Sequence, residues 1–190
     1  MTISRRGILA TGVAVLISPA QEQKKLKLGF IGTGHRAWAH IQVLKAIADF
    51  EVLALADPTS EFLDRAASLV GPGVRTYSNY EEMLDKEREL DGVIVVTPTF
   101  LHAAPTIAAL SSGHHVLCEK PMALTVDEAN QMIAASEKAG KVLQIGLQMR
   151  YDPLYEKMAQ LVKTGEIGPL QYVAGNLWRT PYQASQRCAI

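Results

Sequence analysis

The sequence lacks an excess of charge, internal repeats and any apolar run long enough to cross a membrane. Its 190 residues include 19 lysines and arginines and 19 aspartates and glutamates, so the formal net charge is zero. Nucleic acids and anionic membrane surfaces attract proteins with a basic surplus, so we expect neither as a partner. The partner must instead be inferred from individual sites, and those point to a small molecule.

Cysteine is scarce as well. Cys118 and Cys188 lie far apart and match neither a Cys-x-x-Cys motif nor the spacing of metal ligands, so we expect two unpaired thiols. No two histidines have metal-ligand spacing near a carboxylate. The sequence therefore predicts no metal site.

The first twenty residues have a composition of their own. Arg5 and Arg6 precede the apolar run 7–17, which is too short to span a bilayer, and small residues follow at 18–20, where a signal peptidase cleaves. This pattern resembles a twin-arginine export signal and predicts a periplasmic or secreted protein with no membrane anchor after signal removal. The alternative is a mildly apolar tail on a cytoplasmic protein.

Residues 25–146 alternate short apolar runs with segments of helical period. Such alternation is typical of βαβ units, and it predicts an α/β fold with a Rossmann-type doubly wound parallel sheet. Unbroken apolar character, as in 52–56, indicates strands covered on both faces. The expected strands are 26–31, 52–56, 74–77, 93–96, 115–118 and 142–145, and the expected helices are 37–48, 61–70, 79–86, 106–110 and 126–140.

Residues 147–190 follow a different pattern. A helical stripe beginning at Leu154 ends before Gly165, and residues 170–178 resemble a strand with nothing to pair with. We therefore expect the start of an α+β second domain, for substrate binding or dimerisation, that is truncated at Ile190. A homo-oligomer is expected only if the full second domain is present.

The connection between the first strand and the first helix carries the motif Gly-x-Gly-x-x-Ala. Gly32 permits a tight turn, Gly34 lets the backbone approach a diphosphate, and the small Ala37 allows close packing of helix on strand. The helix that begins with His35 and Arg36 then presents its N-terminus to the phosphates. The motif predicts a dinucleotide site, whereas the alternative is a glycine turn that binds nothing.

Asp57 ends the second predicted strand. A carboxylate at this position accepts hydrogen bonds from the adenosine ribose and repels the additional 2′-phosphate of NADP, so NAD is the expected cofactor. Arg36 lies close enough in the sequence pattern to leave NADP open. The alternative role for Asp57 is a helix cap.

Three further motifs follow the glycine loop in order: Asp57-Pro58, the hexapeptide 97–102 and the hexapeptide 118–123. With them the chain resembles the Gfo/Idh/MocA family of oxidoreductases, and Glu-Lys-Pro is the most specific element. The resemblance implies a cis Lys-Pro bond. It also implies that two sets of residues line the nicotinamide half of the cofactor and its reacting end: Thr97, Pro98, Thr99 and His102, and then Glu119, Lys120 and Pro121.

Lys120 is the catalytic residue that the resemblance implies. Its ammonium could hydrogen-bond a substrate hydroxyl and stabilise the alkoxide that develops as hydride leaves. The alternative is a solvated lysine paired with Glu119. In the family, an Asp and a His of the second domain complete the acid–base apparatus, and those positions would fall beyond Ile190.

The expected function is that of an NAD(P)-dependent oxidoreductase acting on a sugar, cyclitol or related polyol. Its substrate class is implied by the resemblance alone. Two alternatives stand beside it. One is a glycosidase that uses bound NAD in a transient redox step, and the other is a truncated, catalytically inactive dinucleotide-binding module.

Overall fold

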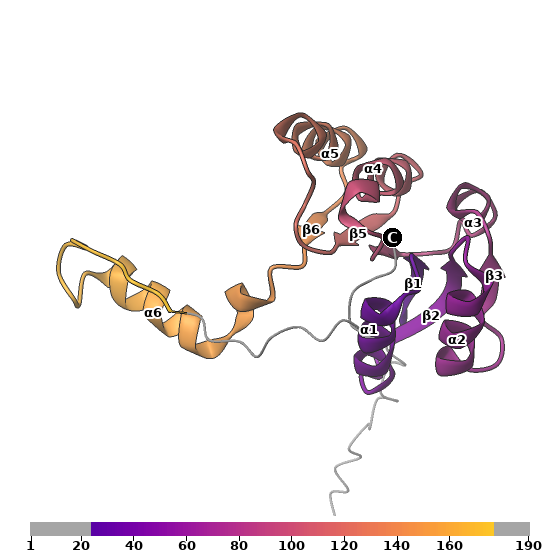
Figure 1. Ribbon diagram of the computed structural model, residues 1–190, viewed down its shortest axis with the longest axis horizontal. Coiled ribbons are helices and arrows are strands. Elements are labelled where there is room, and N and C mark those ends of the chain that lie inside the picture. The colour runs from indigo at the N-terminus through magenta and orange to yellow at the C-terminus, as the bar shows by residue number, and fades with distance from the viewer. Residues whose placement is uncertain (1–23, 177–190) are drawn as a thin grey trace, which may run out of the picture. The chain divides into compact units, whose positions relative to one another are not determined.

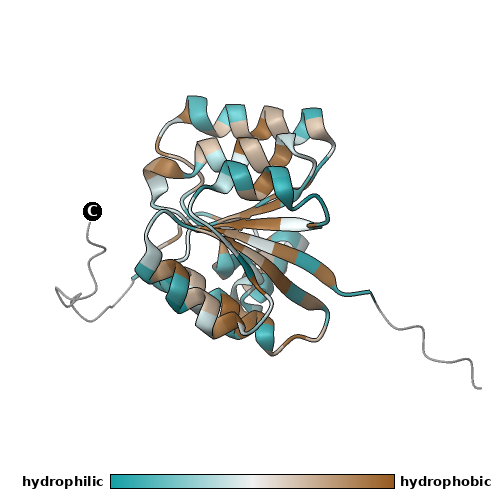
Figure 2. Ribbon diagram, turned by 90° about the vertical axis from the view of Figure 1, so that its right-hand side faces the viewer, coloured by the Kyte–Doolittle hydropathy of each residue, from teal (hydrophilic) through white to brown (hydrophobic). Residues whose placement is uncertain are grey.

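The computed structural model of this chain describes residues 24–176, which divide into two compact units between Gly146 and Leu147. The expected export signal at 1–20, Cys188 and the end of the expected last strand lie outside the described residues. The first unit is a six-stranded parallel sheet with helices on both faces (Figures 1 and 2). This unit carries every predicted cofactor residue.

The sheet has the strand order β3-β2-β1-β4-β5-β6. From β1 the chain winds outward to β3, then returns to pair β4 with the free side of β1 and continues to β6. The winding direction reverses between β1 and β4, so the predicted doubly wound Rossmann sheet is confirmed. The strands are β1 Leu26–Ile31, β2 Phe50–Ala56, β3 Arg75–Tyr77, β4 Gly92–Val95, β5 His115–Cys118 and β6 Leu143–Ile145.

Helices connect the strands and cover the sheet. Helix α1 contacts α2, whereas α4 contacts both α3 and α5. Local signals fix their ends: the Asn79 side chain accepts the N–H groups of Glu81 and Glu82, and Thr125 forms a reciprocal capping box with Glu128. The helices are α1 His35–Lys45, α2 Ser60–Val70, α3 Tyr80–Lys86, α4 Ala103–Ser111 and α5 Val126–Ala139, with a short 3₁₀ turn η1 at Thr99–Leu101.

The core consists of two layers, one on each face of the sheet. Phe30, Leu55 and Ile94 pack under α1 and α2, while their sequence neighbours Ile31 and Val95 pack under α3, α4 and α5. Successive strand side chains point to opposite faces, so a strand buried on both sides must be apolar at every position. This explains the unbroken apolar runs in the sequence.

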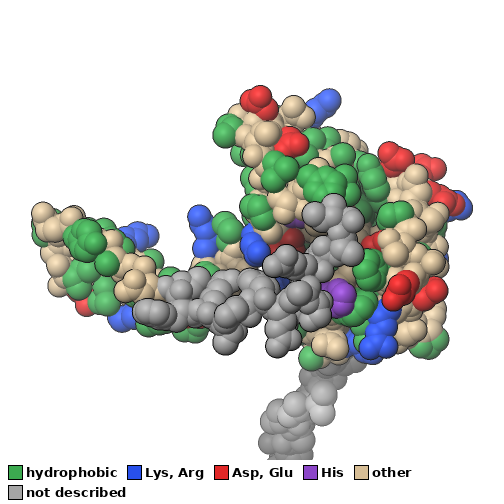
Figure 3. Space-filling view, viewed as in Figure 1, with side chains coloured by type: hydrophobic (Ala, Val, Ile, Leu, Met, Phe, Trp, Pro, Cys, Tyr) green, Lys and Arg blue, Asp and Glu red, His purple; other side chains and the backbone are tan. Residues whose placement is uncertain are grey.

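The second unit contains helix α6, Pro153–Thr164. The Asp152 side chain accepts the N–H of Leu154 at its start, and Gly165, with φ at +76°, ends it. Hydrophobic side chains are exposed along this helix, as Figure 3 shows for one face. The helical stripe is thus confirmed as a helix.

The strand predicted at 170–178 is absent from residues 170–176, the part of it that lies within the described chain. A strand exists only when its backbone groups pair with a neighbouring strand. No described residue pairs with this segment. The prediction was wrong for these residues because alternating side chains do not provide the partner that a strand requires.

Candidate functional site

The predicted cofactor residues gather at one edge of the sheet. Gly32 follows β1, Asp57 follows β2, Thr97 follows β4 and Glu119 follows β5. The carboxyl ends of parallel strands share an edge, and ligands bind there where the winding reverses. The topology therefore brings together residues that lie far apart in the sequence.

The two glycines of the loop have different physical tasks. Gly32 has φ at +87°, and a Cβ atom there would lie 2.8 Å from the backbone of Val96 and Thr97, so only glycine fits. A Cβ atom at Gly34 would meet no atom within 4 Å, so that position faces open space. Gly32 is needed for the fold, and Gly34 leaves room for a ligand.

Helix α1 begins directly after Gly34 with its first N–H groups free of any side-chain cap. Its first turn also contains no acidic residue. Helix N-termini carry a partial positive charge and unpaired N–H donors, which together suit an anion such as a diphosphate. The residues present at this loop fit NAD.

Asp57 connects the glycine loop to the tip of β2. Its Oδ2 accepts the N–H of Thr33 at 2.7 Å, and its Oδ1 accepts the N–H of Thr59 at 2.8 Å. The side chain is largely buried, so its orientation is fixed. Each carboxylate oxygen can accept a further hydrogen bond, as a ribose hydroxyl would require.

His35 and Arg36 both begin α1 but are directed to different neighbours. The His35 ring lies 4.4 Å from the Trp38 ring, centroid to centroid, and is exposed. Arg36 donates from Nε to Oε1 of Glu119 at 2.5 Å, at the tip of β5. The guanidinium of Arg36 is therefore already bound by a carboxylate of its own protein.

The connection after β4 holds Thr97, Pro98 and Thr99 at the same edge, with η1 formed by Thr99–Leu101. Pro98 is exposed, and the Thr97 hydroxyl donates to the carbonyl of Leu101 at 3.1 Å. These residues are placed where a dinucleotide would cross the strand tips. Their contact with the cofactor stays a prediction.

His102 is placed differently from what its expected cofactor contact requires. The side chain is only 2% exposed. Its Nδ1 lies 2.8 Å from the carbonyl oxygen of Pro121, and its Nε2 lies 2.9 Å from the carbonyl oxygen of Thr97. Both ring nitrogens face carbonyl oxygens of the protein, so the imidazole lies between the two loops and presents no nitrogen to a ligand.

Glu119 is a buried carboxylate with three hydrogen bonds. Its Oε1 accepts from Arg36 Nε and lies 2.8 Å from His40 Nε2, and its Oε2 accepts the N–H of Lys120 at 3.0 Å. Burial alone would raise the pKa of this carboxyl, but the hydrogen bonds from His40, Arg36 and the Lys120 backbone outweigh it and lower the pKa. Glu119 is therefore ionised at neutral pH.

His40 is the residue of this cluster that the sequence did not identify. Its position one helical turn after Arg36 puts both side chains on one face of α1, and this spacing was the available signal. The spacing alone does not show that the end of β5 lies opposite that face of α1.

Lys120 is exposed, and its peptide bond to Pro121 is cis, as expected. Within residues 24–176 its ammonium has no hydrogen-bond or ion-pair partner. The alternative pairing with Glu119 does not form, because that carboxylate is occupied by α1 and by the Lys120 backbone. Lys120 thus extends from a fixed backbone at the carboxyl edge of the sheet, where the cofactor site is predicted.

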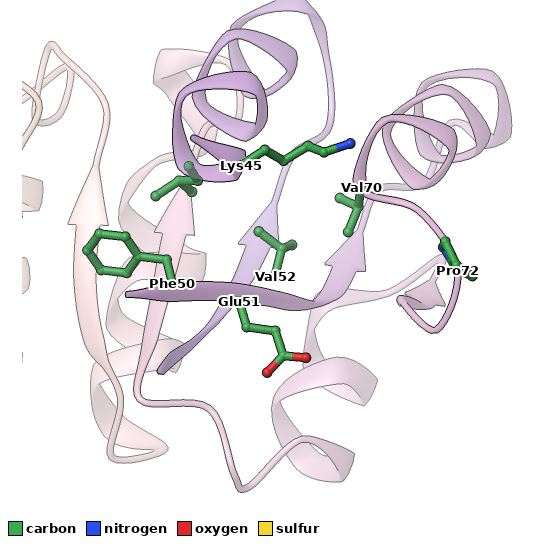
Figure 4. A pocket seen from close by; sticks show the side chains of 7 residues that line it. Lys45, Phe50, Glu51, Val52, Val70 and Pro72 are labelled. Atoms are coloured by element: carbon green, nitrogen blue, oxygen red, sulfur yellow. The ribbon is translucent and has the colours of Figure 1, made fainter. Parts of the chain in front are cut away.

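A pocket of about 190 Å³ lies at the opposite edge of the sheet (Figure 4). Residues from the end of α1, the start of β2 and the end of α2 line it, among them Lys45, Phe50 and Val70. The amino ends of the strands lie there, so this pocket is separate from the predicted site. Lys45 also donates to the carbonyl of Leu69.

No group of three or more His, Cys, Asp or Glu side chains within residues 24–176 could hold a metal ion. None of the helices in that range is both long and apolar enough to cross a membrane.

Comparison with known families decides the relationship of this chain. Residues 26–147 match the model of the oxidoreductase family with an NAD-binding Rossmann fold, the Gfo/Idh/MocA family. The chain belongs to this family. The resemblance drawn from the glycine loop and the Glu-Lys-Pro motif is confirmed, as are the fold and NAD as the cofactor of the family.

Individual members of the Gfo/Idh/MocA family are similar over the same region. Inositol 2-dehydrogenase of Salmonella typhimurium is 30% identical over 152 residues, which are 79% of this chain and 45% of that protein. The structure of scyllo-inositol dehydrogenase from Lactobacillus casei with NAD(H) and scyllo-inositol has a TM-score of 0.69 at 26% identity, covering 76% of this chain and 43% of that one.

A second solved structure is the WlbA dehydrogenase from Bordetella pertussis in complex with NADH and UDP-GlcNAcA. It has a TM-score of 0.72 at 27% identity and covers 76% of this chain and 41% of that one. This chain therefore spans less than half the length of the relatives it matches. The shared part is the one that carries the glycine loop, Asp57 and the Glu-Lys-Pro motif.

Proposed function

We propose that this chain binds NAD across the strand tips and serves an oxidoreductase that transfers hydride between nicotinamide and a sugar, cyclitol or related polyol. The observation that carries the proposal is the open position at Gly34 beside an uncapped helix N-terminus. Relatives named inositol dehydrogenases support the substrate class. When bound, NAD supplies the acceptor for the hydride.

NAD is preferred over NADP in this proposal. Asp57 is held at the ribose end by two backbone N–H groups, so its negative charge stays where a 2′-phosphate would lie. Arg36, the residue that could bind such a phosphate, is bound to Glu119 instead. The sequence left NADP open on the strength of Arg36, and this ion pair argues against it.

Lys120 is the proposed catalytic residue. Its ammonium is exposed at the end of β5, and a substrate hydroxyl placed beside the nicotinamide would lie within its reach. The ammonium would donate a hydrogen bond to the substrate oxygen and stabilise negative charge there while the C–H bond breaks. Further acid–base groups, and any homo-oligomer, would belong to the part of the relatives that this chain does not span.

The binding half of the proposal can be tested with a pair of matched glycines. A Cβ atom at Gly34 or at Gly175 meets no atom within 4 Å, and neither glycine has a positive φ. Gly34→Ala should weaken NADH binding in calorimetry about tenfold or more by occupying the space for the diphosphate, whereas Gly175→Ala should not change it. Equal affinity of both variants would contradict the proposed site.

The proposed catalytic role of Lys120 is tested by measuring turnover. Incubation with NAD and a panel of sugars and cyclitols should yield NADH, and Lys120→Met should lower its rate about 100-fold or more without weakening the fold. A chain that binds NADH and turns over no substrate would leave the inactive dinucleotide-binding module. A chain that releases sugar from a glycoside without net NADH would favour the glycosidase.

Export through the twin-arginine route is part of the same proposal. It rests on Arg5 and Arg6 before the apolar run 7–17. Replacing both arginines with lysine should retain the protein in the cytoplasm, as cell fractionation would show. Unchanged export of the double variant would contradict this route.

A further inference from the structure

The segment Glu119–Lys120–Pro121 is attached to the protein on both sides of the lysine. The side chain before Lys120 is bound by α1, and the carbonyl after it is bound by a residue at the start of α4. Each attachment involves a buried or half-buried histidine. The two histidines, His40 and His102, come from opposite faces of the sheet.

On the first side, the Glu119 carboxylate is enclosed. His40 and Arg36 reach its Oε1 from one turn of α1, and the Lys120 N–H reaches its Oε2. Gly146 closes it from the end of β6, because a Cβ atom there would come within 3.4 Å of the carboxylate carbon. The orientation of the peptide unit between Glu119 and Lys120 is therefore set by groups that are themselves fixed.

On the second side, His102 connects two loops. One ring nitrogen contacts the carbonyl of Pro121 and the other the carbonyl of Thr97, so the ends of β4 and β5 are joined through a single side chain. The imidazole is 2% exposed and cannot move without disturbing the core around it. The peptide that follows Lys120 is thus held in register with the predicted nicotinamide loop.

We infer that His40 and His102 are positioning residues, which hold the backbone on either side of Lys120 and so fix where its ammonium meets the nicotinamide half of the cofactor. The inference rests on the proposed function. Its physical reason is pre-organisation: a lysine with four rotatable bonds is accurate only if its backbone is fixed. In this role each histidine acts through the backbone beside Lys120 and does not need to touch the cofactor.

The test separates the two halves of the cofactor by comparing NADH with ADP-ribose, which has the same adenosine and diphosphate but no nicotinamide. Their affinities for the 190-residue chain are measured by calorimetry, together with the fluorescence of bound NADH. The variants are His40→Leu and His102→Phe, which remove the hydrogen bonds. His40→Gln and His102→Gln keep an amide donor.

We expect His40→Leu and His102→Phe to weaken NADH binding about tenfold and to shift the fluorescence of bound NADH. A tenfold loss corresponds to one hydrogen bond of the displaced Lys120 ammonium. ADP-ribose affinity should stay within about twofold, because the glycine loop and Asp57 are untouched. The glutamine variants should show a smaller loss of NADH affinity. His40 is partly exposed, so its variant remains informative if His102→Phe fails to fold.

Two control variants change similar interactions at a distance from the site. Glu87→Gln alters a buried ion pair, and His115→Leu removes a histidine that accepts the N–H of Val142, both at the amino edge of the sheet. Both should lower the unfolding temperature and leave the ratio of NADH to ADP-ribose affinity unchanged.

Three outcomes would overturn the inference. His40 and His102 variants that bind NADH like the wild type would show that the histidines do not position the site. Equal losses for NADH and ADP-ribose would show a general structural role. A wild-type chain that binds neither ligand would refute the proposed function itself, and with it any role of the histidines in positioning Lys120.

Discussion

The two edges of the sheet each contain a buried glutamate paired with an arginine, yet the two pairs have different surroundings. At the amino edge, Glu87 receives hydrogen bonds from Arg75 at 2.5 Å and from the hydroxyl of Tyr77. Arg75 also reaches Glu89. These partners lie on β3 and on the connection before β4, so Glu87 attaches an edge strand to the rest of the sheet.

At the carboxyl edge, Glu119 receives its donors from α1, and beside it Lys120 is left without a partner among the described residues. In both places burial would raise the pKa of the carboxyl, and hydrogen bonds from neighbouring donors lower it instead. The chemistry is the same, but the charged groups around Glu87 pair with one another, whereas Glu119 lies beside a lysine whose ammonium has no partner within residues 24–176. We interpret the first as structural and the second as part of a binding site.

The largest loss of stability should come from Gly32→Ala at the carboxyl edge. The positive φ and the 2.8 Å approach to the backbone of Val96 and Thr97, directly after β4, predict a cost of about 3 kcal/mol in the free energy of unfolding. Urea denaturation measures it. Gly34→Ala should change the same quantity by about 0.5 kcal/mol, and comparable losses in the two variants would show that the loop is not arranged as described.

Glu87→Gln should have the next largest effect. It leaves Arg75 and Tyr77 with a weaker acceptor, which should lower the free energy of unfolding by about 2 kcal/mol. The loss is smaller than for a fully buried ion pair because the Arg75 side chain is 42% exposed. Urea denaturation gives the cost and NADH calorimetry the affinity. A loss of NADH affinity in this variant would break the distinction between the two edges.

The contribution of Glu87 should also depend on pH. Its pKa is lowered in the folded state, so its stabilisation is complete above the ordinary glutamate value of about 4.3 and is lost as the pH falls through the lowered pKa. The stability gap between the wild type and Glu87→Gln should therefore be widest at neutral pH and shrink in acid. A gap that widens on acidification would mean that the carboxyl is not ionised in the fold.

Glu82→Gln should have the smallest effect. The ion pair of Glu82 with Lys86 lies on the surface of α3, where solvent and salt screen the two charges and such pairs contribute little to stability. The substitution is chemically the same as Glu87→Gln, so the difference between them measures burial. Equal effects would show that the number of ion pairs, and not their surroundings, decides stability.

The sequence predicted most of the fold because its signals are local. The β-branched run before Thr97 predicted β4, and the expected helix 79–86 corresponds to α3, which Asn79 caps. The beginning of β2 was missed because Glu51 breaks the apolar run, although it pairs with Lys27 of β1. Strand pairing with a neighbour extended β2 beyond its apolar residues.

The contacts of the candidate site were less predictable. The glycine loop and Asp57 have a recognisable pattern, so their meeting at one edge could be expected. The partners of Glu119 and His102 depend on which helix face and which loop lie opposite them, and single residues carry no such information. The predicted strand at 170–178 failed for a related reason, since pairing is a property of two segments.

Cys118 lies in β5 directly before Glu119, and its thiol is fully buried. Burial raises the pKa of this thiol to about 11, so at neutral pH it is neither ionised nor reachable by alkylating reagents. In a chain with Cys188 replaced by serine, the rate of Cys118 labelling would report how often the end of β5 opens. A bound ligand that stabilises this edge would slow the labelling. The labelling rate of Cys118 therefore measures ligand binding at the site without fluorescence or turnover.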